Sequence, residues 1–328
     1  MIRKILFLLL LSVIASIAFA DNFSLSVQEK RQMNVEAENW MDDMPDGIQD
    51  RLSDAVNHAM RGFFSEIEYF RNIGDTIGIK SYKVNIKNIQ GGVSSNIPMR
   101  LYSGIGKNKN TKKPLLIYFH GGGWSMGSIE TTDKFCRALA AYGNINIISV
   151  AYPLAPEYSY PSAIDICTSA TEYIISKAEG WGSGKEFVSI GGDGAGGNIA
   201  LSVYEKLPQN YKIRSLVLYY PIINANGDLN PQTKRLFGRG YGFDSRLWEA
   251  YSNAYKGEEI SFKKPLPPTL LISAGKDIII DEIKSFSLKN KEINFVDFSE
   301  ALHGFITDGQ QKTAFRKAVE FTDNFLAR

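Results

Sequence analysis

Apolar residues in the first quarter of the chain recur every three or four positions. In the stretch from Gln49 to Asn72 they are Leu52, Val56, Met60, Phe63, Phe64, Ile67 and Phe70. This spacing places them along one face of a helix. We therefore expect residues 24–72 to be helical.

From residue 82 onward the pattern changes to short apolar runs. Tyr82 to Ile86 alternates between apolar and polar residues, as a half-buried strand does, and Ile97 to Tyr102 is its expected partner. Continuous runs of the buried-strand type follow at 114–119, 145–152, 187–190, 215–220, 269–273 and 293–298. Helical patterns lie between them at 131–142, 162–178, 197–206 and 311–326. This alternation predicts an α/β fold with a mostly parallel sheet covered on both faces.

One segment interrupts the alternation. Asp228 to Arg239 is polar, and Phe243 to Tyr255 is aromatic with helical spacing. We expect residues 226–262 to be a lid inserted between two strands. Together with the N-terminal helical region, residues 21–75, this insertion would cap the strand ends of a main domain that spans residues 76–328.

The first twenty residues have the pattern of a secretory signal peptide. Arg3 and Lys4 precede an apolar run from Ile5 to Ile17, and Ala18-Phe19-Ala20 matches an A-x-A cleavage site. The run is short for a membrane span, so removal is favoured over a retained anchor. The pattern predicts a secreted or periplasmic protein that starts near Asp21 and keeps no stable membrane span.

The amino-acid composition argues against a disordered protein and against a nucleic-acid-binding protein. The 328 residues are 44% hydrophobic and 22% charged, which suffices for the core of one large domain and argues against extended disorder. The formal net charge is +2, and Arg3 and Lys4 account for it, so the body from Asp21 onward is neutral. A neutral body without a basic cluster argues against nucleic acid as a partner. The oligomeric state does not follow from the sequence.

The cysteines and histidines give no sign of a metal site. Cys136 and Cys167 are the only cysteines, and both fall in helical patterns. Export would permit a disulfide, but two separate buried thiols fit at least as well. Three histidines without a His-x-x-x-His pair or a cysteine cluster argue against zinc, and no cofactor is expected.

A glycine-rich loop follows the apolar run 114–119. Its residues are His120, Gly121, Gly122, Gly123 and Trp124. Glycines let the backbone approach a ligand closely and turn its N–H groups toward it. In lipases and esterases an HGGG loop in this place supplies the donors of an oxyanion hole. A plain glycine turn is the alternative, but the position directly after a buried strand favours the oxyanion loop.

A second glycine-rich turn follows the run 187–190 and opens a helix. Its residues are Gly192-Asp193-Gly194-Ala195-Gly196-Gly197-Asn198. A strand, a turn and a helix in this order are the context of a nucleophile elbow, whose pattern is G-x-S-x-G. The centre here is Gly194 rather than serine. The letters also spell the G-x-G-x-x-G of a dinucleotide-binding loop, but the strand comes late in the chain and the required acidic residue is missing.

Several blocks together resemble the hormone-sensitive-lipase-like esterases, a family with the α/β-hydrolase fold. The blocks are His120–Trp124, Ala151–Glu157 with Tyr160-Pro161 and Asp165, Gly192–Ala200, Pro267–Leu270, Gly275–Asp277 and His303–Phe305. Their order and approximate spacing are similar to that family from about residue 80 to the C-terminus. Two residues depart from the pattern: Pro153 replaces the usual arginine, and Gly194 replaces the catalytic serine.

The resemblance implies roles for the remaining site residues. Asp277 would be the orienting acid and His303 the base, in the chain order of α/β-hydrolases. The N–H groups of Gly121, Gly122, Gly123 and Ala195 would form the oxyanion hole, with His120 and Asp193 in support. The alternatives are a helix N-cap for Asp277 and a plain surface loop for His303.

Three further residues are not expected to take part in the reaction. His58 lies in the N-terminal helical region and is expected to be structural. Ser125 and Ser189 could in principle replace the missing hydroxyl. However, Ser125 belongs to the oxyanion side of the site and Ser189 is expected inside a strand, so neither is a good candidate.

The resemblance implies a carboxylic-ester hydrolase for short acyl esters, impaired because Gly194 occupies the nucleophile position. A non-catalytic ligand-binding protein on the same fold is the alternative. A one-base change from a serine codon would also produce this glycine. In each case the expected partner is a small-molecule ester or ligand.

Overall fold

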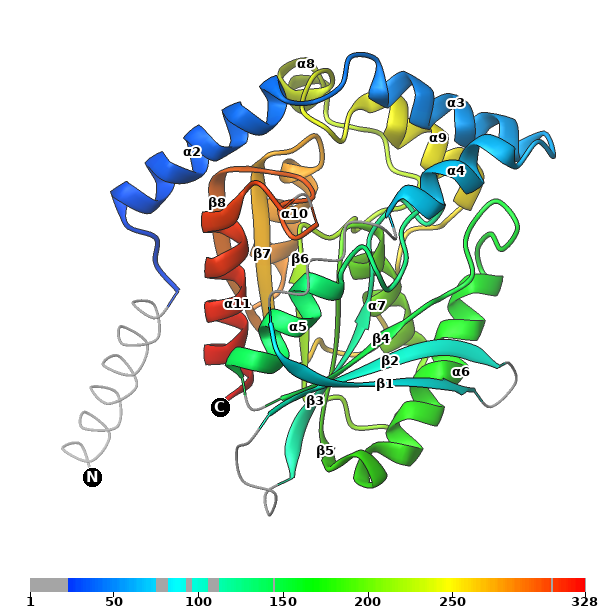
Figure 1. Cartoon of the computed structure of the whole chain (residues 1–328), viewed down its shortest axis with the longest axis vertical. Coiled ribbons are helices and arrows are strands. Elements are labelled where there is room, and N and C mark those ends of the chain that lie inside the picture. Colours follow the sequence, from blue (N-terminus) through cyan, green and yellow to red (C-terminus); the bar gives the residue numbers. More distant parts are fainter. Residues whose placement is uncertain are drawn as a thin grey trace.

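One mixed sheet forms the centre of the computed structural model, which describes residues 23–74, 82–92, 96–105, 112–143, 145–307 and 309–327 (Figure 1). Within these residues the sheet has eight strands: β1 (Val84–Gly91), β2 (Ile97–Gly104), β3 (Lys113–Phe119), β4 (Asn146–Val150), β5 (Ser183–Asp193), β6 (Ser215–Tyr219), β7 (Thr269–Lys276) and β8 (Ile293–Leu302). Their order is β1-β2-β4-β3-β5-β6-β7-β8. β2 is antiparallel to β1 and β4, and the other neighbouring pairs are parallel. The expected α/β fold with a mostly parallel sheet is confirmed.

The apolar runs of the sequence become the central strands. Every residue of β4 and β6 is buried, as is expected where helices cover both faces of a parallel sheet. β1 lies at the edge, and most of its residues are exposed or half-buried. This difference explains why the central strands are continuously apolar in sequence while the first one alternates.

Helices flank the sheet in two groups. They are α5 (Asp133–Tyr142), α6 (Ser162–Lys177), the short 3-10 helix η2 (Ala178–Trp181), α7 (Ala195–Lys206), α10 (Ile280–Lys289) and α11 (Lys312–Leu326). The chain moves from β3 to β4 in one direction and from β4 to β5 in the other. Right-handed crossovers therefore place α5 on one face and α6 and α7 on the other. α11 packs beside α5, and α6 beside α7 (Figure 1).

The remaining helices lie over one end of the sheet. From the N-terminal region come α2 (Val27–Asp42), α3 (Ile48–Met60) and α4 (Ser65–Gly74), and from the insertion come α8 (Pro231–Phe237) and α9 (Ser245–Tyr255). α3 packs on α9, and Arg246 of α9 forms an ion pair with Asp50 of α3. We call these five helices the cap (Figure 1).

The first cap helix is fastened to the last helix of the chain. The carboxylate of Glu36 in α2 accepts hydrogen bonds from the backbone N–H of Thr313 at 2.7 Å and from its hydroxyl at 2.9 Å. Thr313 lies in the first turn of α11, where N–H groups have no acceptor within the helix and a negative charge is favoured. Lys317, one turn later, pairs with Glu29 of α2 at 3.3 Å.

The structure differs from the sequence expectation in three places. The helical spacing at 49–72 covers two helices, because the chain turns at Gly62 with φ of 89° between α3 and α4. β5 begins at Ser183, before its apolar run. α10 was not expected, since only Ile280, Ile283 and Phe286 of its ten residues are buried and polar residues hide this short apolar face.

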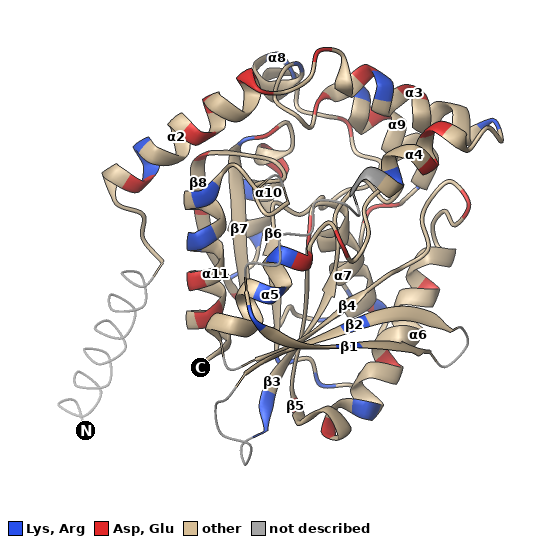
Figure 2. Ribbon diagram, in the orientation of Figure 1, with Lys and Arg blue, Asp and Glu red and all other residues tan. Residues whose placement is uncertain are grey.

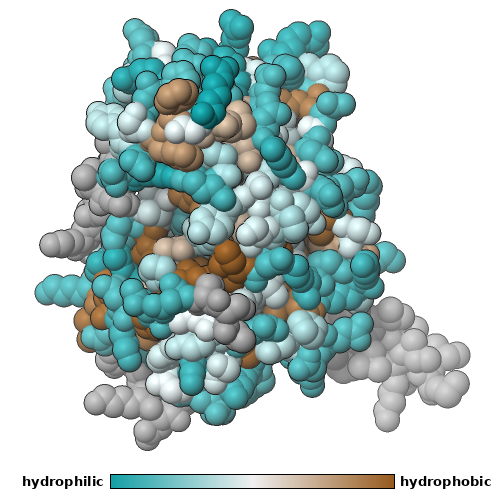
Figure 3. Space-filling model, turned by 90° about the vertical axis from the view of Figure 1, so that its right-hand side faces the viewer, coloured by the Kyte–Doolittle hydropathy of each residue, from teal (hydrophilic) through white to brown (hydrophobic). Residues whose placement is uncertain are grey.

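The surface of the molecule is mixed in charge and polarity. Both basic and acidic residues lie on the outer helices (Figure 2), and apolar side chains occur as patches between hydrophilic ones (Figure 3). Among the described residues, no helix is long and apolar enough to cross a membrane. The predicted signal peptide, residues 1–20, lies outside the described residues. Cys136 in α5 and Cys167 in α6 are both free and buried.

Candidate active site

The turn between β5 and α7 holds position 194 at the carboxyl end of β5, a central strand of the sheet. Gly194 has φ of 51° and ψ of −116°, a conformation that side chains disfavour. Its N–H donates to the carbonyl of Tyr219 at 3.0 Å. A Cβ built on Gly192 or Gly196 would lie 2.4 or 2.0 Å from the carbonyl oxygen of Phe119, so the turn admits no side chain at either place. This is the sharp strand-to-helix turn that the glycine pattern predicts.

A histidine and an aspartate meet opposite this turn. A Cβ built on Gly194 would lie 3.1 Å from Nε2 of His303. The other ring nitrogen, Nδ1, lies 2.6 Å from Oδ2 of Asp277. The second oxygen of Asp277 accepts the N–H of Ile279 at 3.2 Å, and the residue is only 1% exposed. Positions 194, 277 and 303, which are far apart in the sequence, therefore form one connected row.

Aromatic rings fix the orientation of His303. Its ring centroid lies 4.6 Å from that of Tyr220, which follows β6, and 4.4 Å from that of Phe243 in the cap insertion. The His303 side chain is 15% exposed whereas that of Asp277 is covered completely. His303 can therefore exchange a proton with a molecule in the site, and Asp277 can act only through His303.

The HGGG loop runs beside the elbow in an unusual backbone conformation. Gly122, Gly123 and Trp124 all have positive φ, of 112°, 58° and 59°. The carbonyl of Gly122 accepts the N–H of Met126 at 2.8 Å, which closes the loop. Ala195 is the first residue of α7, so its N–H has no acceptor within the helix. Gly122, Gly123 and Ala195 all line the same cavity.

Asp193 supports the site from inside the protein. Its Oδ1 accepts the hydroxyl of Tyr118 at 2.8 Å and the N–H of Gly121 at 2.9 Å. Burial raises the pKa of the Asp193 carboxyl, against the opposing effect of these donors. The Gly121 N–H is used in this bond. The role of oxyanion donor expected for Gly121 therefore does not fit the structure, and Gly121 braces the loop instead.

His120 also braces the loop. Its ring stacks on Tyr152 at a centroid distance of 4.3 Å, and its Nδ1 lies 2.8 Å from the carbonyl oxygen of Gly121. Burial lowers the pKa of His120 to about 4, so the ring is neutral at ordinary pH. A buried neutral imidazole that is not among the residues lining the cavity does not act as the base.

A cavity of about 480 Å³ connects the elbow, the loop and the cap. Its described wall consists of Trp40, Phe70, Gly121, Gly122, Gly123, Met126, Gly127, Thr131, Asp193, Ala195, Tyr220, Ile222, Gly242, Phe243, Leu247, Tyr251, His303, Gly304 and Thr307. Lysine, arginine and glutamate are absent from this described wall, and most of its side chains are apolar. Such a cavity suits a small neutral molecule.

The other candidate residues lie outside this cavity. Ser189 is buried in β5, where its hydroxyl lies 2.7 Å from that of Ser215. Ser125 is also buried and does not line the cavity. His58 is half-exposed at the corner between α3 and α4, with Nδ1 2.7 Å from Glu66.

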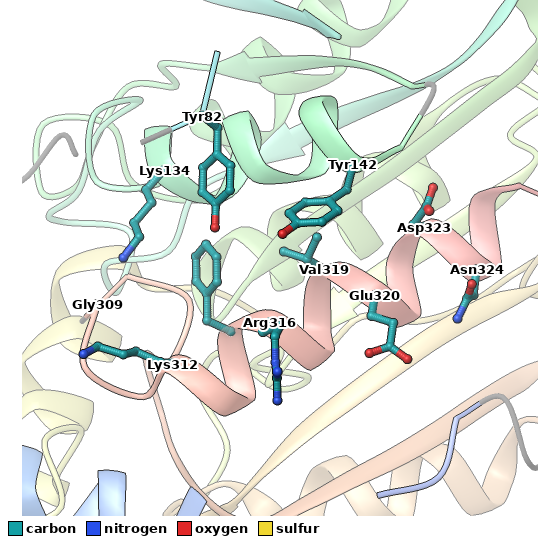
Figure 4. Close-up of a pocket in the computed structure, with 11 residues that line it drawn as sticks. Tyr82, Lys134, Tyr142, Gly309, Lys312, Arg316, Val319, Glu320, Asp323 and Asn324 are labelled. Carbon is teal, nitrogen blue, oxygen red and sulfur yellow. The ribbon is translucent and has the colours of Figure 1, made fainter. Parts of the chain in front are cut away.

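A second cavity, of about 630 Å³, lies between α5 and α11. The hydroxyls of Tyr82 and Tyr142 point into it, and Lys134 and Lys312 stand at one end, as Figure 4 shows. None of the residues at the elbow, in the HGGG loop or in the acid–base pair lines it. We therefore place the candidate active site in the cavity at Gly194.

Sequence reasoning missed the cap residues of the wall. Trp40 comes from α2, Phe70 from α4, and Leu247 and Tyr251 from α9. In sequence they are ordinary apolar positions of amphipathic helices, and helical periodicity gives the same signal for a side chain that faces a cavity and one that faces the core. Only the aromatic content of 243–255 pointed to this role.

Comparison with known proteins finds esterases and a putative α/β hydrolase among the relatives of this chain. The chain is 36% identical over 180 residues to the carboxylesterase NlhH of Mycobacterium tuberculosis, a match that covers 54% of this chain and 55% of that one. It is 29% identical over 222 residues to an arylesterase of Saccharolobus solfataricus, covering 63% and 71%. A putative α/β hydrolase of Acanthamoeba polyphaga mimivirus matches at 27% over 220 residues, covering 62% of each chain. The matched regions thus span roughly half to three quarters of these relatives.

Solved structures share the architecture. A hyperthermophilic esterase from Pyrobaculum calidifontis superimposes with a TM-score of 0.72 at 22% identity, covering 84% of this chain and 96% of that one. An ester hydrolase from the metagenome of Lake Arreo, solved with a bipyridine phosphonate derivative, gives 0.68 at 25%, covering 84% and 97%. The profile of the Abhydrolase_3 family, described as alpha/beta hydrolase fold, matches residues 116–307. Since this match covers more than half of the chain and includes the elbow, the HGGG loop and the Asp277–His303 pair, the protein belongs to the Abhydrolase_3 family of α/β hydrolases.

Proposed function

We propose that this chain binds small neutral carboxylic esters and hydrolyses them slowly, without a covalent intermediate. The observation that carries the proposal is the position of His303. Its Nε2 faces Gly194 at 3.1 Å from the Cβ that a serine would have there, while Asp277 holds Nδ1. A base is thus aimed at the nucleophile position of the fold, but glycine offers no hydroxyl.

In the proposed reaction, water takes the place of the serine hydroxyl. His303 Nε2 accepts a proton from a water beside Gly194, and the oxygen of that water adds to the ester carbonyl carbon. The N–H groups of Gly122, Gly123 and Ala195 stabilise the negative oxygen that forms. When the carbon–oxygen bond to the alcohol breaks, His303 returns the proton to the leaving alkoxide. Serine hydrolases without their nucleophile keep roughly 10³- to 10⁴-fold acceleration over water, and we expect activity of that order.

The cavity wall supports the choice of substrate. Asp193 is the one carboxylate of the described wall and His303 its one imidazole, and Asp193 is 3% exposed and paired with neutral donors. An anionic substrate would find no cation there. Trp40, Phe70 and Leu247 would contact a short acyl chain.

A binding role without hydrolysis is the second candidate, and Gly194 itself favours it. Glycine accepts positive φ at little cost, whereas another residue in such a conformation costs about 1–3 kcal/mol. Gly194 therefore relieves strain at the elbow while it removes the attacking group. This combination suits a protein that keeps the pocket for a ligand.

Two substitutions at one position separate these functions. Gly194→Ser adds a hydroxyl, and Gly194→Ala adds the same Cβ and the same strain without it. We expect Gly194→Ser to show a burst of p-nitrophenol from p-nitrophenyl acetate and labelling by a fluorophosphonate, and to unfold at a lower temperature than the native chain. Gly194→Ala should lose stability similarly but show no burst. The native chain should hydrolyse the ester slowly, without a burst and without labelling.

The outcomes are distinct. If Gly194→Ser stays folded and gains no esterase activity, the esterase proposal is wrong and binding is the better function. Slow turnover by the native chain that survives in His303→Gln would show that the proposed water mechanism is wrong.

We further propose that the protein is exported, on the basis of the signal-peptide pattern of residues 1–20. Intact-mass analysis of protein recovered from the periplasm or medium should give a mature chain that starts near Asp21. Recovery of the uncleaved chain in the cytoplasm alone would contradict this.

A further inference from the structure

One arginine of the cap reaches into the main domain beside the HGGG loop. Arg71 lies in α4, and its side chain is only 17% exposed. Its Nε donates to the carbonyl of Ser125 at 2.9 Å, and its Nη2 donates to the carbonyl of Ala155 at 2.9 Å. The same guanidinium pairs with the carboxylate of Glu157 at 2.7 and 3.1 Å. One side chain of α4 thus binds two segments whose contact residues lie 54 to 86 positions further along the chain.

The loop that Arg71 holds is strained. Trp124 has φ of 59° although it carries a large side chain, and it follows two glycines that also have positive φ. Such a conformation persists only where the surroundings enforce it. Two contacts besides Arg71 do so. The carbonyl of Trp124 accepts the N–H of Ala155 at 2.8 Å, and its ring stacks on Tyr255 of α9 at 4.4 Å.

Arg71 completes this set of contacts. The Trp124–Ala155 hydrogen bond links the HGGG loop to the segment 151–157. Arg71 adds to this link, because it binds both the carbonyl of Ser125, the next residue of the loop, and the carbonyl of Ala155. The planar guanidinium suits this task because its donors point in fixed directions. The carbonyls of Ser125 and Ala155 are thus satisfied by a residue of another region of the chain.

We propose that Arg71 is a positioning residue, which holds the HGGG loop in the shape that presents the Gly122 and Gly123 N–H groups and makes this shape depend on the docked cap. This inference rests on the proposed function for its catalytic consequence. Its structural part, that Arg71 fixes the loop, stands independently of that function. Arg71 does not line the cavity and would not touch a substrate.

The first experiment measures hydrogen–deuterium exchange in the otherwise native chain. Arg71→Gln is compared with Arg246→Gln, since Arg246 also joins two cap segments but bonds Asp50 and Asp244 rather than the loop. We expect peptides that contain residues 121–127 and 153–157 to exchange about 10-fold faster or more in Arg71→Gln alone. Peptides from β8 should not change in either variant. Unchanged exchange at 121–127, or an equal increase in both variants, would overturn the proposal.

The second experiment tests the catalytic consequence in a Gly194→Ser background. Arg71→Gln should lower kcat for p-nitrophenyl acetate about 10- to 100-fold with little change in KM, because a displaced oxyanion hole weakens transition-state binding. Arg71→Lys, which cannot reach three acceptors in fixed directions, should fall between Arg71→Gln and the parent. Glu157→Gln keeps both carbonyl contacts and should lower kcat by less than Arg71→Gln.

The results separate this inference from the proposed function. If Gly194→Ser has no esterase activity, the proposed function fails, and the exchange experiment still decides whether Arg71 holds the loop. If Gly194→Ser is active and Arg71→Gln leaves kcat unchanged, or raises KM alone in a variant whose circular dichroism is native, the positioning role is wrong.

Discussion

The two halves of the candidate site are held by different parts of the molecule. Asp277 and His303 directly follow β7 and β8, and the hydrogen bonds that fix them come from the main domain. The HGGG loop also follows a strand, β3, but its shape depends on Tyr251 and Tyr255 of α9 and on Arg71 of α4. The hydrogen bonds of the acid–base pair therefore lie within the main domain, with one ring contact from Phe243 of the insertion, whereas the bonds and contacts that shape the oxyanion loop are divided between the main domain and the cap.

This difference predicts which substitutions disturb each half of the candidate site. A pair fixed by strand ends should keep its geometry as long as the sheet is folded. The HGGG loop is held by both the main domain and the cap, so its shape should change when the cap moves relative to the main domain. We therefore expect substitutions in the main domain to affect proton transfer, and substitutions in the cap to affect oxyanion stabilisation and ligand affinity.

The largest effect is expected from the acid–base half. In the Gly194→Ser background, Asp277→Asn should lower kcat about 10⁴-fold, because an amide no longer fixes the His303 tautomer or stabilises its charged form. Single-turnover hydrolysis of p-nitrophenyl butyrate measures this loss. The unfolding temperature should be followed in parallel. A loss below tenfold would mean that His303 does not depend on Asp277.

The next effect tests the contact between the loop and the cap. A Cβ on Gly123 would lie 2.1 Å from the ring of Tyr251, and Gly123 has φ of 58°. Gly123→Ala should therefore lower the free energy of unfolding by about 2–4 kcal/mol. Gly47→Ala is the control, since its φ is 68° and nothing lies within 4 Å, and it should cost only about 1 kcal/mol. Equal costs in urea unfolding would show that the ring moves away freely.

A pH-dependent effect concerns Glu282 of α10, which accepts the N–H of Ile223 at 2.9 Å. Burial raises the pKa of Glu282 from its ordinary value of 4.5 to about 8. The folded state therefore binds this proton more tightly than the unfolded state. The contribution of Glu282 to stability is full below pH 4.5 and is lost as the pH rises to about 8, at no more than about 1.4 kcal/mol per pH unit.

Glu282→Gln tests this assignment, because the amide oxygen can still accept the Ile223 N–H but does not titrate. Urea midpoints at pH 5, 6, 7 and 8 should fall more steeply in the native chain than in the variant. Parallel curves would contradict the raised pKa. Glu282→Gln should leave the hydrogen–deuterium exchange rates of residues 121–127 unchanged, since Glu282 belongs to the main domain.

The smallest effect is expected from the apolar wall of the cap. Trp40→Ala should weaken binding of a butyrate ester about three- to tenfold in the Gly194→Ser background, because apolar contact area is lost. Acetate esters should be affected less. Val35→Ala on the same helix is the control, since Val35 is 47% exposed and does not line the cavity. Equal changes for both esters would place the acyl chain elsewhere.

The strands of the sheet and the glycine-rich turns could be predicted from the sequence, but the contacts between the main domain and the cap could not. Short apolar runs marked the strands because strands covered on both faces need apolar residues throughout. Glycines at 192, 194 and 196 marked the elbow because backbone crowding forbids side chains at two of them. These signals are local and can be recognised within a few residues.

The bonds that shape the oxyanion loop are long-range and leave no such signal. Arg71 is one charged residue on a helix that has several, and nothing nearby in sequence indicates that it binds the carbonyls of Ser125 and Ala155. The use of the Gly121 N–H by Asp193 was equally hidden, since a motif names residues but not the directions of their N–H groups. The role of Trp40 as a wall residue depends on where α2 lies over the sheet.

The bond between Glu36 and Thr313 makes the placement of α2 depend on a helix that is synthesised much later. These residues are 277 positions apart, so the acceptor on α2 is synthesised long before its donor on α11. Until the final helix is made, α2 has neither this bond nor the Glu29–Lys317 pair. Contacts of such large sequence separation form late and slowly. α2 can therefore take its final place in the cap only after α11 has been synthesised, and a substitution that removes the Glu36 carboxylate should loosen α2, and with it Trp40 in the cavity wall, more than the other cap helices.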